Sequence, residues 1–412
     1  MIKTLNIAIL MQADDNWMGG IIYIKNLVKS IAIIYIKTLI KSIPVFPANK
    51  REHIKLYLFI GSNLKKSYYE ELENLVEEIC VTNCIKPSFL NRLLWKVGQN
   101  VSWLRDRRLI KLLESKEIDF VYPVPINWGI SWEFNCGWST WIPDFQHKYL
   151  PSYFSTKEIK SRDKAFEYLS NNSLNIVFSS KSALSDFAAF YPESKAQKFV
   201  LSFRTIPNQD WFENDLAPTL VQEKYNLPNK FFLVSNQFWI HKNHQLIIEA
   251  LILLKRTNVK PVVVCTGKLY DSRFPKYGEE IKNSIEKNSL SDQFIILGLI
   301  PRWDQIQLMR RSLAVIQPSL FEGWSTVVED ARVLGKTILL SDISVHKEQN
   351  SPSAIFFKPD SSQELANHLE LLTNKLMPGP DLISESEART NNKIECQTYA
   401  EQFLNIVQTV VS

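Results

Sequence analysis

Residues 317–341, QPSLFEGWSTVVEDARVLGKTILLS, place a carboxylate and a helix start between two apolar strands. The polar turn in this stretch contains Glu322, and Thr326 and Glu329 after it have the T-x-x-E spacing of a capping box. The pattern therefore predicts a strand, a loop, a short helix and a second strand. Glu322 would lie at the carboxyl end of the first strand, beside the free N–H groups of the helix. A carboxylate next to amide donors suits a ligand that carries hydroxyls and phosphate.

Two further loops carry residue types that can bind such a ligand. Gly19 and Gly20 separate the first predicted strand from the first predicted helix, where paired glycines let the backbone approach a ligand. A bare turn is the alternative for this pair. Asp144 and His147 follow a strand predicted over residues 138–142, and aromatic residues border them. A carboxylate and an imidazole there can hold a sugar hydroxyl or take its proton, whereas a turn aspartate and a surface histidine are the structural alternative.

The residues from Glu322 onward resemble the donor-sugar loop of the retaining GT-B glycosyltransferases, the large group 1 family. That family has two acids in an E-x7-E pattern, and here the eighth position after Glu322 is Asp330, so the pattern is E-x7-D. The resemblance implies that Glu322 contacts the transferred sugar and that Asp330 contacts the ribose. Plain turn polarity at Glu322 and compensation of the helix dipole by Asp330 are the alternatives. The resemblance also assigns donor binding to the residues between the acids, Gly323, Trp324, Ser325 and Thr326.

The segment SNQFWIHKNH, residues 235–244, resembles the donor-phosphate motif of the same family. The family pairs an arginine with a lysine five residues later. Lys242 matches the lysine, whereas Gln237 stands in the arginine position. An ammonium beside a helix start is a good ligand for a diphosphate, and Gln237 can donate a hydrogen bond but not a charge. Lys268 and Arg302 are the candidates for supplying the missing positive charge.

Other family features have partial counterparts. The family has a glycine loop near the donor diphosphate and the acceptor, which the loop at Gly20 resembles. Gly298 lies in a segment that resembles the loop that holds the nucleotide base through backbone groups. The family often has a His-Asp pair after a strand of the first domain, and here Pro143 replaces the histidine and Asp144 keeps its position. The base on the acceptor side therefore stays open between Asp144 and His147.

Apolar runs of strand length alternate with helix-like segments, which predicts parallel, doubly wound sheets. We expect strands over residues 5–10, 54–60, 120–124, 138–142, 174–178, 199–204, 231–234, 261–266, 294–297, 313–316 and 337–340. We expect helices from residue 181, capped by Ser180, and over 244–256, 278–288, 303–311 and 391–412. The acid-rich residues 70–78 also have a helical pattern.

A chain of 412 residues is long enough for two domains. We predict an N-terminal Rossmann-like acceptor-binding domain over residues 1–205 and a proline-containing linker over 206–228. A C-terminal Rossmann-like nucleotide-sugar-binding domain follows over 229–385, and a helix over 386–412 is expected to cross back to the first domain. The fold class is α/β, with the GT-B architecture that the resemblance implies, two such domains facing across a cleft.

Composition restricts the class of protein. A net charge of +5 gives no argument for nucleic-acid binding, and the apolar content of 45% is ample for full cores. The five cysteines are scattered and odd in number, which favours reduced thiols in a cytoplasmic protein. The N-terminus lacks a signal-peptide cleavage pattern, and no uncharged apolar stretch approaches the ~18 residues of a membrane-spanning helix.

Residues 22–31, IYIKNLVKSI, and 34–43, IYIKTLIKSI, form a tandem repeat with a period of twelve. Twelve residues at ~100° each rotate the apolar stripe by ~120°, so the helix either extends as one apolar rod or breaks between the copies. A local duplication and a membrane-facing amphipathic segment are both open. The basic stretch over 89–113 leaves two similar alternatives, a solvated helix or contact with an anionic membrane.

These observations predict a retaining hexosyltransferase. It would move a hexose from a nucleoside diphosphate sugar to a glycan or lipid-linked acceptor, in cell-surface polysaccharide synthesis, with no metal or other cofactor. We expect Glu322, Lys242, Asp144 and His147 to be catalytic. The protein is expected to be cytoplasmic, and peripheral contact with the inner face of the membrane is left open. The alternative functions are a nucleotide-sugar epimerase of the same fold and a non-catalytic sugar-nucleotide-binding protein.

Overall fold

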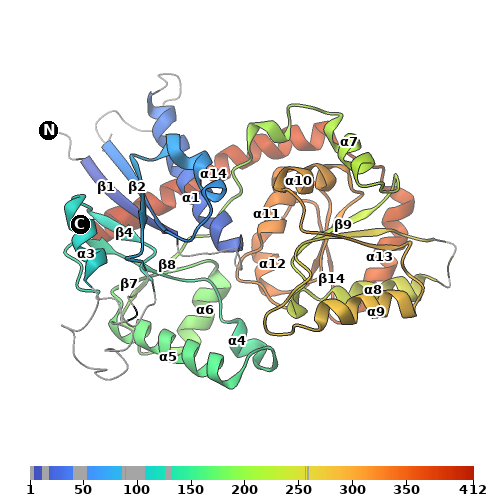
Figure 1. The fold of residues 1–412 in the computed structure, drawn as a ribbon, viewed down its shortest axis with the longest axis horizontal. Coiled ribbons are helices and arrows are strands. Elements are labelled where there is room, and N and C mark those ends of the chain that lie inside the picture. Colours follow the sequence, from blue (N-terminus) through green and yellow to red (C-terminus); the bar gives the residue numbers. More distant parts are fainter. Residues whose placement is uncertain are drawn as a thin grey trace. The chain divides into compact units, whose positions relative to one another are not determined.

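The computed structural model describes residues 4–11, 18–39, 53–85, 89, 107–125, 132–255, 257 and 259–412. The chain divides into two compact units (Figure 1). The first unit consists of residues 1–143, 161–206 and 395–412, and the second of residues 144–160 and 207–394. The division is therefore not a single cut along the chain.

The first unit is built on parallel strands. One sheet has the order β3-β2-β1-β4-β5, and its strands are β1 (Thr4–Met11), β2 (His53–Gly61), β3 (Glu78–Thr82), β4 (Phe120–Tyr122) and β5 (Gly137–Trp138). A second sheet has the order β6-β7-β8, and its strands are β6 (Thr140–Ile142), β7 (Asn175–Phe178) and β8 (Gln197–Val200). The helices of this part of the chain are α1 (Met18–Leu39), α3 (Arg108–Ser115), α5 (Thr156–Asn172) and α6 (Lys181–Phe190). The Ser180 hydroxyl accepts a hydrogen bond from the amide of Ala183, which confirms the predicted cap of α6.

The second unit has one six-stranded parallel sheet of order β11-β10-β9-β12-β13-β14. Its strands are β9 (Phe232–Ser235), β10 (Val263–Thr266), β11 (Phe294–Gly298), β12 (Val315–Gln317), β13 (Ile338–Ser341) and β14 (Ala354–Phe357). Its helices are α4 (Gln146–Tyr149), α7 (Ala217–Lys224), α8 (His244–Leu254), α9 (Tyr277–Lys287), α10 (Arg302–Arg311), α11 (Thr326–Val333), α12 (Ser344–Gln349) and α13 (Ser362–Lys375). The order reverses direction at β9 and β12, and ligands of such sheets bind at the carboxyl ends of strands where this happens.

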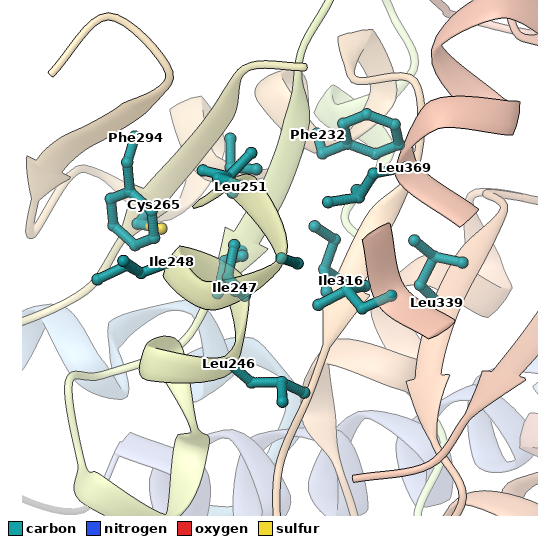
Figure 2. Packing of buried hydrophobic residues seen from close by; sticks show 14 of the residues in the cluster. Phe232, Leu246, Ile247, Ile248, Leu251, Cys265, Phe294, Ile316, Leu339 and Leu369 are labelled. Atoms are coloured by element: carbon teal, nitrogen blue, oxygen red, sulfur yellow. The ribbon is translucent and has the colours of Figure 1, made fainter. Parts of the chain in front are cut away.

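The sheet of the second unit is covered on both faces. Successive residues of a strand point to opposite faces, so Phe232 and Val234 pack with α8, α9 and α13, whereas Leu233 packs with α7, α10 and α11. Figure 2 shows the first of these cores, with Leu251 of α8 and Leu369 of α13 among its members. Burial on both faces explains why these strands are short, continuous apolar runs.

Most predicted strands are present, with four differences between the predicted and the observed elements. The strand expected over 138–142 is two short strands, β5 and β6. The strand expected over 199–204 is β8, which ends at Val200. The helix expected over residues 70–78 is wrong, because a 3-10 helix over Glu70–Leu75 is followed by the edge strand β3. The edge strand β14 was not predicted either.

Residues 207–228, expected to be part of a linker, belong to the second unit. They form the 3-10 helix Gln209–Trp211 and the helix α7, and Trp211, Val221 and Leu227 are buried in the core beside α10. The prolines in this segment therefore interrupt a packed region. The last helix, α14 (Leu382–Val411), is continuous, and its residues up to Ile394 belong to the second unit and the rest to the first.

The helix α1 continues without a break from Met18 to Leu39, so it includes the first copy of the repeat and the start of the second. In the first copy Lys25 and Lys29 pair with Glu71, while most other side chains are buried. Most of the basic stretch over 89–113 lies outside the described residues. Within the described part of the chain, no helix has the length and apolarity needed to cross a membrane.

Candidate functional site

Lys242 and Glu322, which the sequence places 80 residues apart, form an ion pair with 2.5 Å between Nζ and Oε1. Lys242 ends a 3-10 helix, Ile240–Lys242, after β9, and Glu322 lies in the loop after β12. The two strands are neighbours in the sheet, so both loops leave from the same edge. The side chains are only 14% and 10% exposed, so the pair is not an ordinary surface salt bridge.

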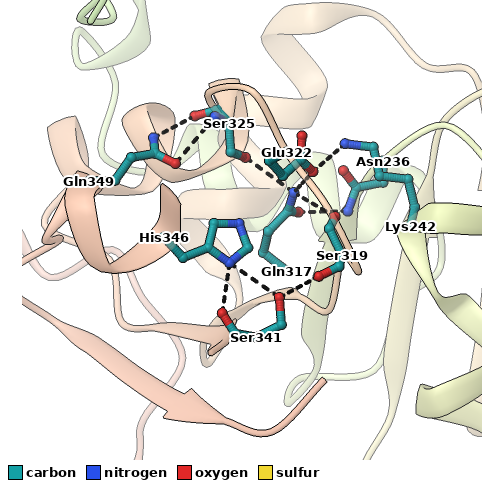
Figure 3. Close-up of polar contacts among 9 residues, drawn as sticks. All are labelled: Asn236, Lys242, Gln317, Ser319, Glu322, Ser325, Ser341, His346 and Gln349. Atoms are coloured by element: carbon teal, nitrogen blue, oxygen red, sulfur yellow. Dashed lines mark hydrogen bonds and ion pairs between the residues drawn. The ribbon is translucent and has the colours of Figure 1, made fainter. Parts of the chain in front are cut away.

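Gln317, the last residue of β12, organises the polar groups around Glu322 (Figure 3). Its Oε1 accepts a hydrogen bond from Asn236 Nδ2 at 2.7 Å, which fixes the orientation of the amide. Its Nε2 then faces Glu322 Oε1 at 2.8 Å, Ser319 Oγ at 3.2 Å and Ser325 Oγ at 3.1 Å. One amide nitrogen with two hydrogens thus faces three oxygens, and the Ser319 hydroxyl also bonds to the carboxylate of Glu322.

The carboxyl group of Glu322 stays ionised despite its surroundings. Burial alone would raise its pKa, but the ammonium of Lys242 outweighs this effect and holds the pKa below its usual value. A buried carboxylate that is charged and accessible to a ligand is a strong acceptor for sugar hydroxyls.

Backbone and side-chain hydrogen bonds join the loops that carry these two residues. The amide of Leu320 donates to the carbonyl of His241 at 2.8 Å. Asn243, with a left-handed φ of 57°, donates from Nδ2 to the carbonyls of Pro318 and Pro359 at 3.2 and 3.0 Å. The buried carboxylate of Asp271 accepts from the amide of Ile240 at 3.1 Å. Lys242 is therefore held on a loop whose backbone is fixed from both sides.

A second layer of polar residues lies behind Glu322. Ser341, at the end of β13, donates its hydroxyl hydrogen to the carbonyl of Ser319 at 2.6 Å. His346 of α12 has Nδ1 2.9 Å from the carbonyl of Ser341. Burial lowers the pKa of His346 to about 4, so its ring is neutral at physiological pH. This layer was not predicted from the sequence, although Gln317 and Ser341 carry a signal, since each is a polar residue that ends an apolar strand.

The start of α11 differs from the prediction. The N-cap is Ser325, not Thr326, and its side chain caps no backbone amide, so the predicted capping box of Thr326 and Glu329 is wrong. The amide of Ser325 instead donates to Gln349 Oε1 at 3.2 Å, and Gln349 Nε2 donates to the Ser325 carbonyl and to Glu329 Oε1, both at 3.0 Å. Gln349 takes the capping role because α12 packs beside this helix start, a tertiary contact that local spacing does not reveal.

Asp330 lies in α11 with its side chain only 1% exposed, and its Oδ1 is 2.6 Å from Nη2 of Arg302. Arg302 also donates from Nη1 to Gln305 Oε1 at 2.7 Å. The carboxylate expected to contact the ribose is thus paired with one of the two basic residues expected to replace the missing arginine. Trp324 and Thr326 lie beside this helix start, partly buried.

The ends of β9, β10 and β11 bring Gln237, Gly267 and Gly298 together. Gly267 has a φ of +128°, and a Cβ at this position would overlap the carbonyl of Asn236. Its amide donates to the carbonyl of Gly298 at 2.8 Å, and Gly298 has a φ of +71°. Glycine at position 267 therefore lets two strand ends approach each other closely.

Asp144 and His147 belong to the second unit, in the short segment over 144–160. Asp144 Oδ1 accepts from the amide of Gln146 at 2.9 Å, which is a turn contact. His147 is buried, with its ring centroid 6.4 Å from that of Phe145 and 6.3 Å from that of Phe154, so it is not a surface histidine. Two residues beyond His147, the ring of Tyr149 is 5.4 Å from the ring of Phe321, the residue before Glu322.

Gly19 and Gly20 occupy the first turn of α1, in the first unit. Their predicted role at the donor remains a prediction.

The family model described as glycosyl transferases group 1 matches residues 220–386 of this chain, which include the Lys242–Glu322 pair. The O-antigen chain mannosyltransferase RfbU of Salmonella typhimurium (strain LT2) is 24% identical over 356 residues, which are 84% of this chain and 87% of that protein.

Two solved structures are similar over nearly the whole chain. A glycosyltransferase from Rickettsia africae ESF-5 has a TM-score of 0.66 at 16% identity and covers 99% of both chains. HepE of Anabaena, in complex with UDP and glucose, has a TM-score of 0.65 at 15% identity and covers 98% of this chain and 100% of its own. At these identities the likeness establishes the fold.

Proposed function

We propose that this chain, which belongs to the group 1 glycosyltransferases and has their GT-B fold, uses Lys242 and Glu322 to transfer a hexose from a nucleoside diphosphate sugar with retention of configuration. The family and the α/β fold of two Rossmann-like units are those that the sequence predicted. The observation that carries the proposal is the 2.5 Å ion pair between residues from two separate sequence motifs.

Glu322 is the group that orients the transferred sugar. Its carboxylate is ionised and accepts hydrogen bonds from Lys242 and Gln317. An ionised carboxylate can only accept, so sugar hydroxyls can bind it as donors, whereas the oxygens of a phosphate would be repelled. The side of the site at Glu322 therefore suits the hexose.

Lys242 is the group that stabilises the leaving diphosphate. When a donor binds, the ammonium exchanges its contact with Glu322 for one with phosphate oxygens, where negative charge develops as the bond from the sugar C1 breaks. A new bond forms from C1 to the acceptor oxygen on the same face, and the acceptor proton passes to the departing phosphate. Asp144 and His147 are the candidates for assisting that proton on the acceptor side.

The nucleotide would lie along the neighbouring strand ends. Gly298 and Gln237 supply backbone and side-chain hydrogen bonds, and Asp330 faces the ribose once Arg302 releases it. Support for the donor class comes from HepE, which was solved with UDP and with UDP-glucose. Support for a glycan or lipid-linked acceptor in cell-surface polysaccharide synthesis comes from the relative RfbU, named as an O-antigen chain mannosyltransferase.

A thermal-shift screen against UDP, GDP, ADP and their hexoses tests the donor class first. A ligand at a hundred times its dissociation constant stabilises a protein by ~2.7 kcal/mol, which is easily detected. Stabilisation by one base identifies the donor, and the absence of any stabilisation would contradict the proposal.

Substitution then tests the two residues. Lys242→Ala and Glu322→Gln are expected to lower transfer at least ~100-fold, because each removes a charge that acts on the reacting sugar or its leaving group. The matched control is Lys347→Ala, which removes an ammonium from an exposed ion pair with Asp342. Full activity in either site variant would refute the assignment.

Contact with a membrane forms a separate part of the proposal, since a lipid-linked acceptor would bring the enzyme to one. The protein is expected to sediment together with vesicles of anionic lipid at low salt, and vesicles of neutral lipid serve as the control. Equal behaviour with both would remove the membrane from the proposal without affecting the reaction.

A further inference from the structure

His346 has a defined tautomer. Its Nδ1 lies 2.9 Å from the carbonyl of Ser341, and a carbonyl oxygen can only accept, so the hydrogen is on Nδ1. The hydroxyl of Ser341 gives its only hydrogen to the carbonyl of Ser319 at 2.6 Å and therefore also accepts from Nδ1, at 3.2 Å. The other ring nitrogen, Nε2, consequently carries a lone pair and no hydrogen.

This Nε2 is buried and has no hydrogen-bond partner among the described residues. A buried acceptor without a donor is costly, so a native structure rarely keeps one without a reason. Figure 3 shows the ring edge with Nε2 turned toward Gln317, Glu322 and Ser325, the residues that surround the proposed sugar site. The unpaired nitrogen is therefore directed toward the polar residues around the proposed sugar site.

The polar neighbours of Nε2 among the described residues make no hydrogen bond to it. Glu322 is an ionised acceptor, and the amide hydrogens of Gln317 are already shared among three oxygens. The ammonium of Lys242 donates to Glu322 Oε1. No described residue supplies the missing donor, and on a bound hexose this donor would be a hydroxyl.

We propose that Nε2 of His346 accepts a hydrogen bond from one hydroxyl of the transferred sugar and so determines which hexose the enzyme accepts. The inference rests on the proposed function. Donor binding draws Lys242 to the diphosphate, which frees Glu322 from its ion pair and opens the space between the carboxylate and the imidazole. His346 is then a specificity-determining residue that reads a single position of the sugar ring.

The test measures binding by calorimetry in the absence of acceptor. The ligands are a nucleoside diphosphate, the corresponding nucleoside diphosphate hexose and four analogues of that donor, each lacking one sugar hydroxyl. The donors are UDP-glucose, UDP-galactose and GDP-mannose, of which the one that stabilises the wild type is used. The variant His346→Asn places an amide nitrogen near Nδ1, which keeps the hydrogen bond to Ser341 and removes only the acceptor at Nε2. The companion His346→Gln places an amide group near Nε2 instead. The control His244→Phe replaces another buried imidazole, one stacked on Phe238 with ring centroids 4.1 Å apart.

In the wild type, removal of one particular hydroxyl is expected to weaken binding about tenfold or more, because Nε2 then stays unpaired. In His346→Asn this penalty should disappear while affinity for the nucleoside diphosphate alone is kept, and His346→Gln should retain part of the penalty. The control His244→Phe should keep the whole penalty.

Three results would overturn the inference. The first is that the wild type binds every deoxy analogue as tightly as the intact donor. The second is that His346→Asn keeps the full penalty. The third is that His346→Asn loses affinity for the nucleoside diphosphate and for the nucleotide sugar equally, which indicates a structural role. The wild-type result stands even where a variant does not fold. Failure of the proposed function is distinct from all three, because the wild type would then bind none of the nucleotide sugars.

Discussion

Substitution of Glu385 is expected to destabilise the second unit strongly, because it would leave a fully buried arginine without its counter-ion. Arg310 of α10 has a side chain with no exposure to solvent. Glu385 of α14 accepts from its Nε and Nη2 at 2.8 and 2.9 Å. Breaking a buried pair from one side typically costs ~3–5 kcal/mol, since the remaining charge stays desolvated.

The contacts that remain in Glu385→Leu place the expected loss at ~3 kcal/mol, the lower end of that range. Nη1 of Arg310 still donates to the carbonyl of Trp211 at 2.8 Å and to Gln307 Oε1 at 3.0 Å. The carboxylate of Asp215 is 3.8 Å from Nη2, but it is 61% exposed and compensates the charge weakly.

This loss is measured by urea unfolding of the full chain, followed by circular dichroism. The unfolding curve is fitted with one transition for each unit. The double variant Arg310→Met/Glu385→Leu is expected to be more stable than Glu385→Leu, because no buried charge is left. Asp342→Ala is the matched control, since its pair with Lys347 is exposed and should contribute less than ~1 kcal/mol. A loss below ~1 kcal/mol in Glu385→Leu, or a double variant less stable than the single one, would refute the reasoning.

Three further predictions concern the same unit. The pKa values of His346 and His244 are lowered by burial to about 4 and about 3, so the unfolded chain binds more protons between pH 6.5 and 4. The free energy of unfolding should therefore fall as the pH drops through that window, and His346→Asn should make the fall in urea-unfolding experiments shallower. Burial likewise lowers the pKa of Lys336 to about 8, so stability should rise with pH between 8 and 10.5, and unfolding of Lys336→Met should lack that rise. Gly267→Ala should lower the melting temperature and weaken nucleotide binding in a thermal-shift assay, because its Cβ would displace the carbonyl of Asn236.

Five strands of the second unit, β9 to β13, were predictable because each is an apolar run, whereas the edge strand β14, which is only partly buried, was not. Lys242 and Glu322 were predictable for a related reason. Each follows a strand of this parallel sheet, so the topology brings both to one edge. What could not be predicted is the partner of each side chain, such as the pairing of Asp330 with Arg302, because that depends on how α10 and α11 pack.

Local rules failed where tertiary contacts replaced them. Thr326 and Glu329 have the spacing of a capping box. Instead, Gln349 of α12 accepts a hydrogen bond from the amide of Ser325 and donates one to the carboxylate of Glu329. The acidic run over 70–78 was misread as helix up to Glu78, where the edge strand β3 begins, and the sheet partner that makes β3 a strand is β2. His346 had no sequence signal, since its importance comes from one unpaired ring nitrogen.

The division of the chain has a consequence for building hybrid enzymes. The backbone passes between the units at residues 143, 160, 206 and 394, so a fragment over 207–394 is not the whole second unit. Such a fragment lacks Tyr149, which covers Phe321, and Tyr153, whose ring is 5.7 Å from that of Phe274. A donor-binding module exchanged between relatives should therefore carry the short segment 144–160 with it, because the aromatic surface beside Glu322 would otherwise be left uncovered.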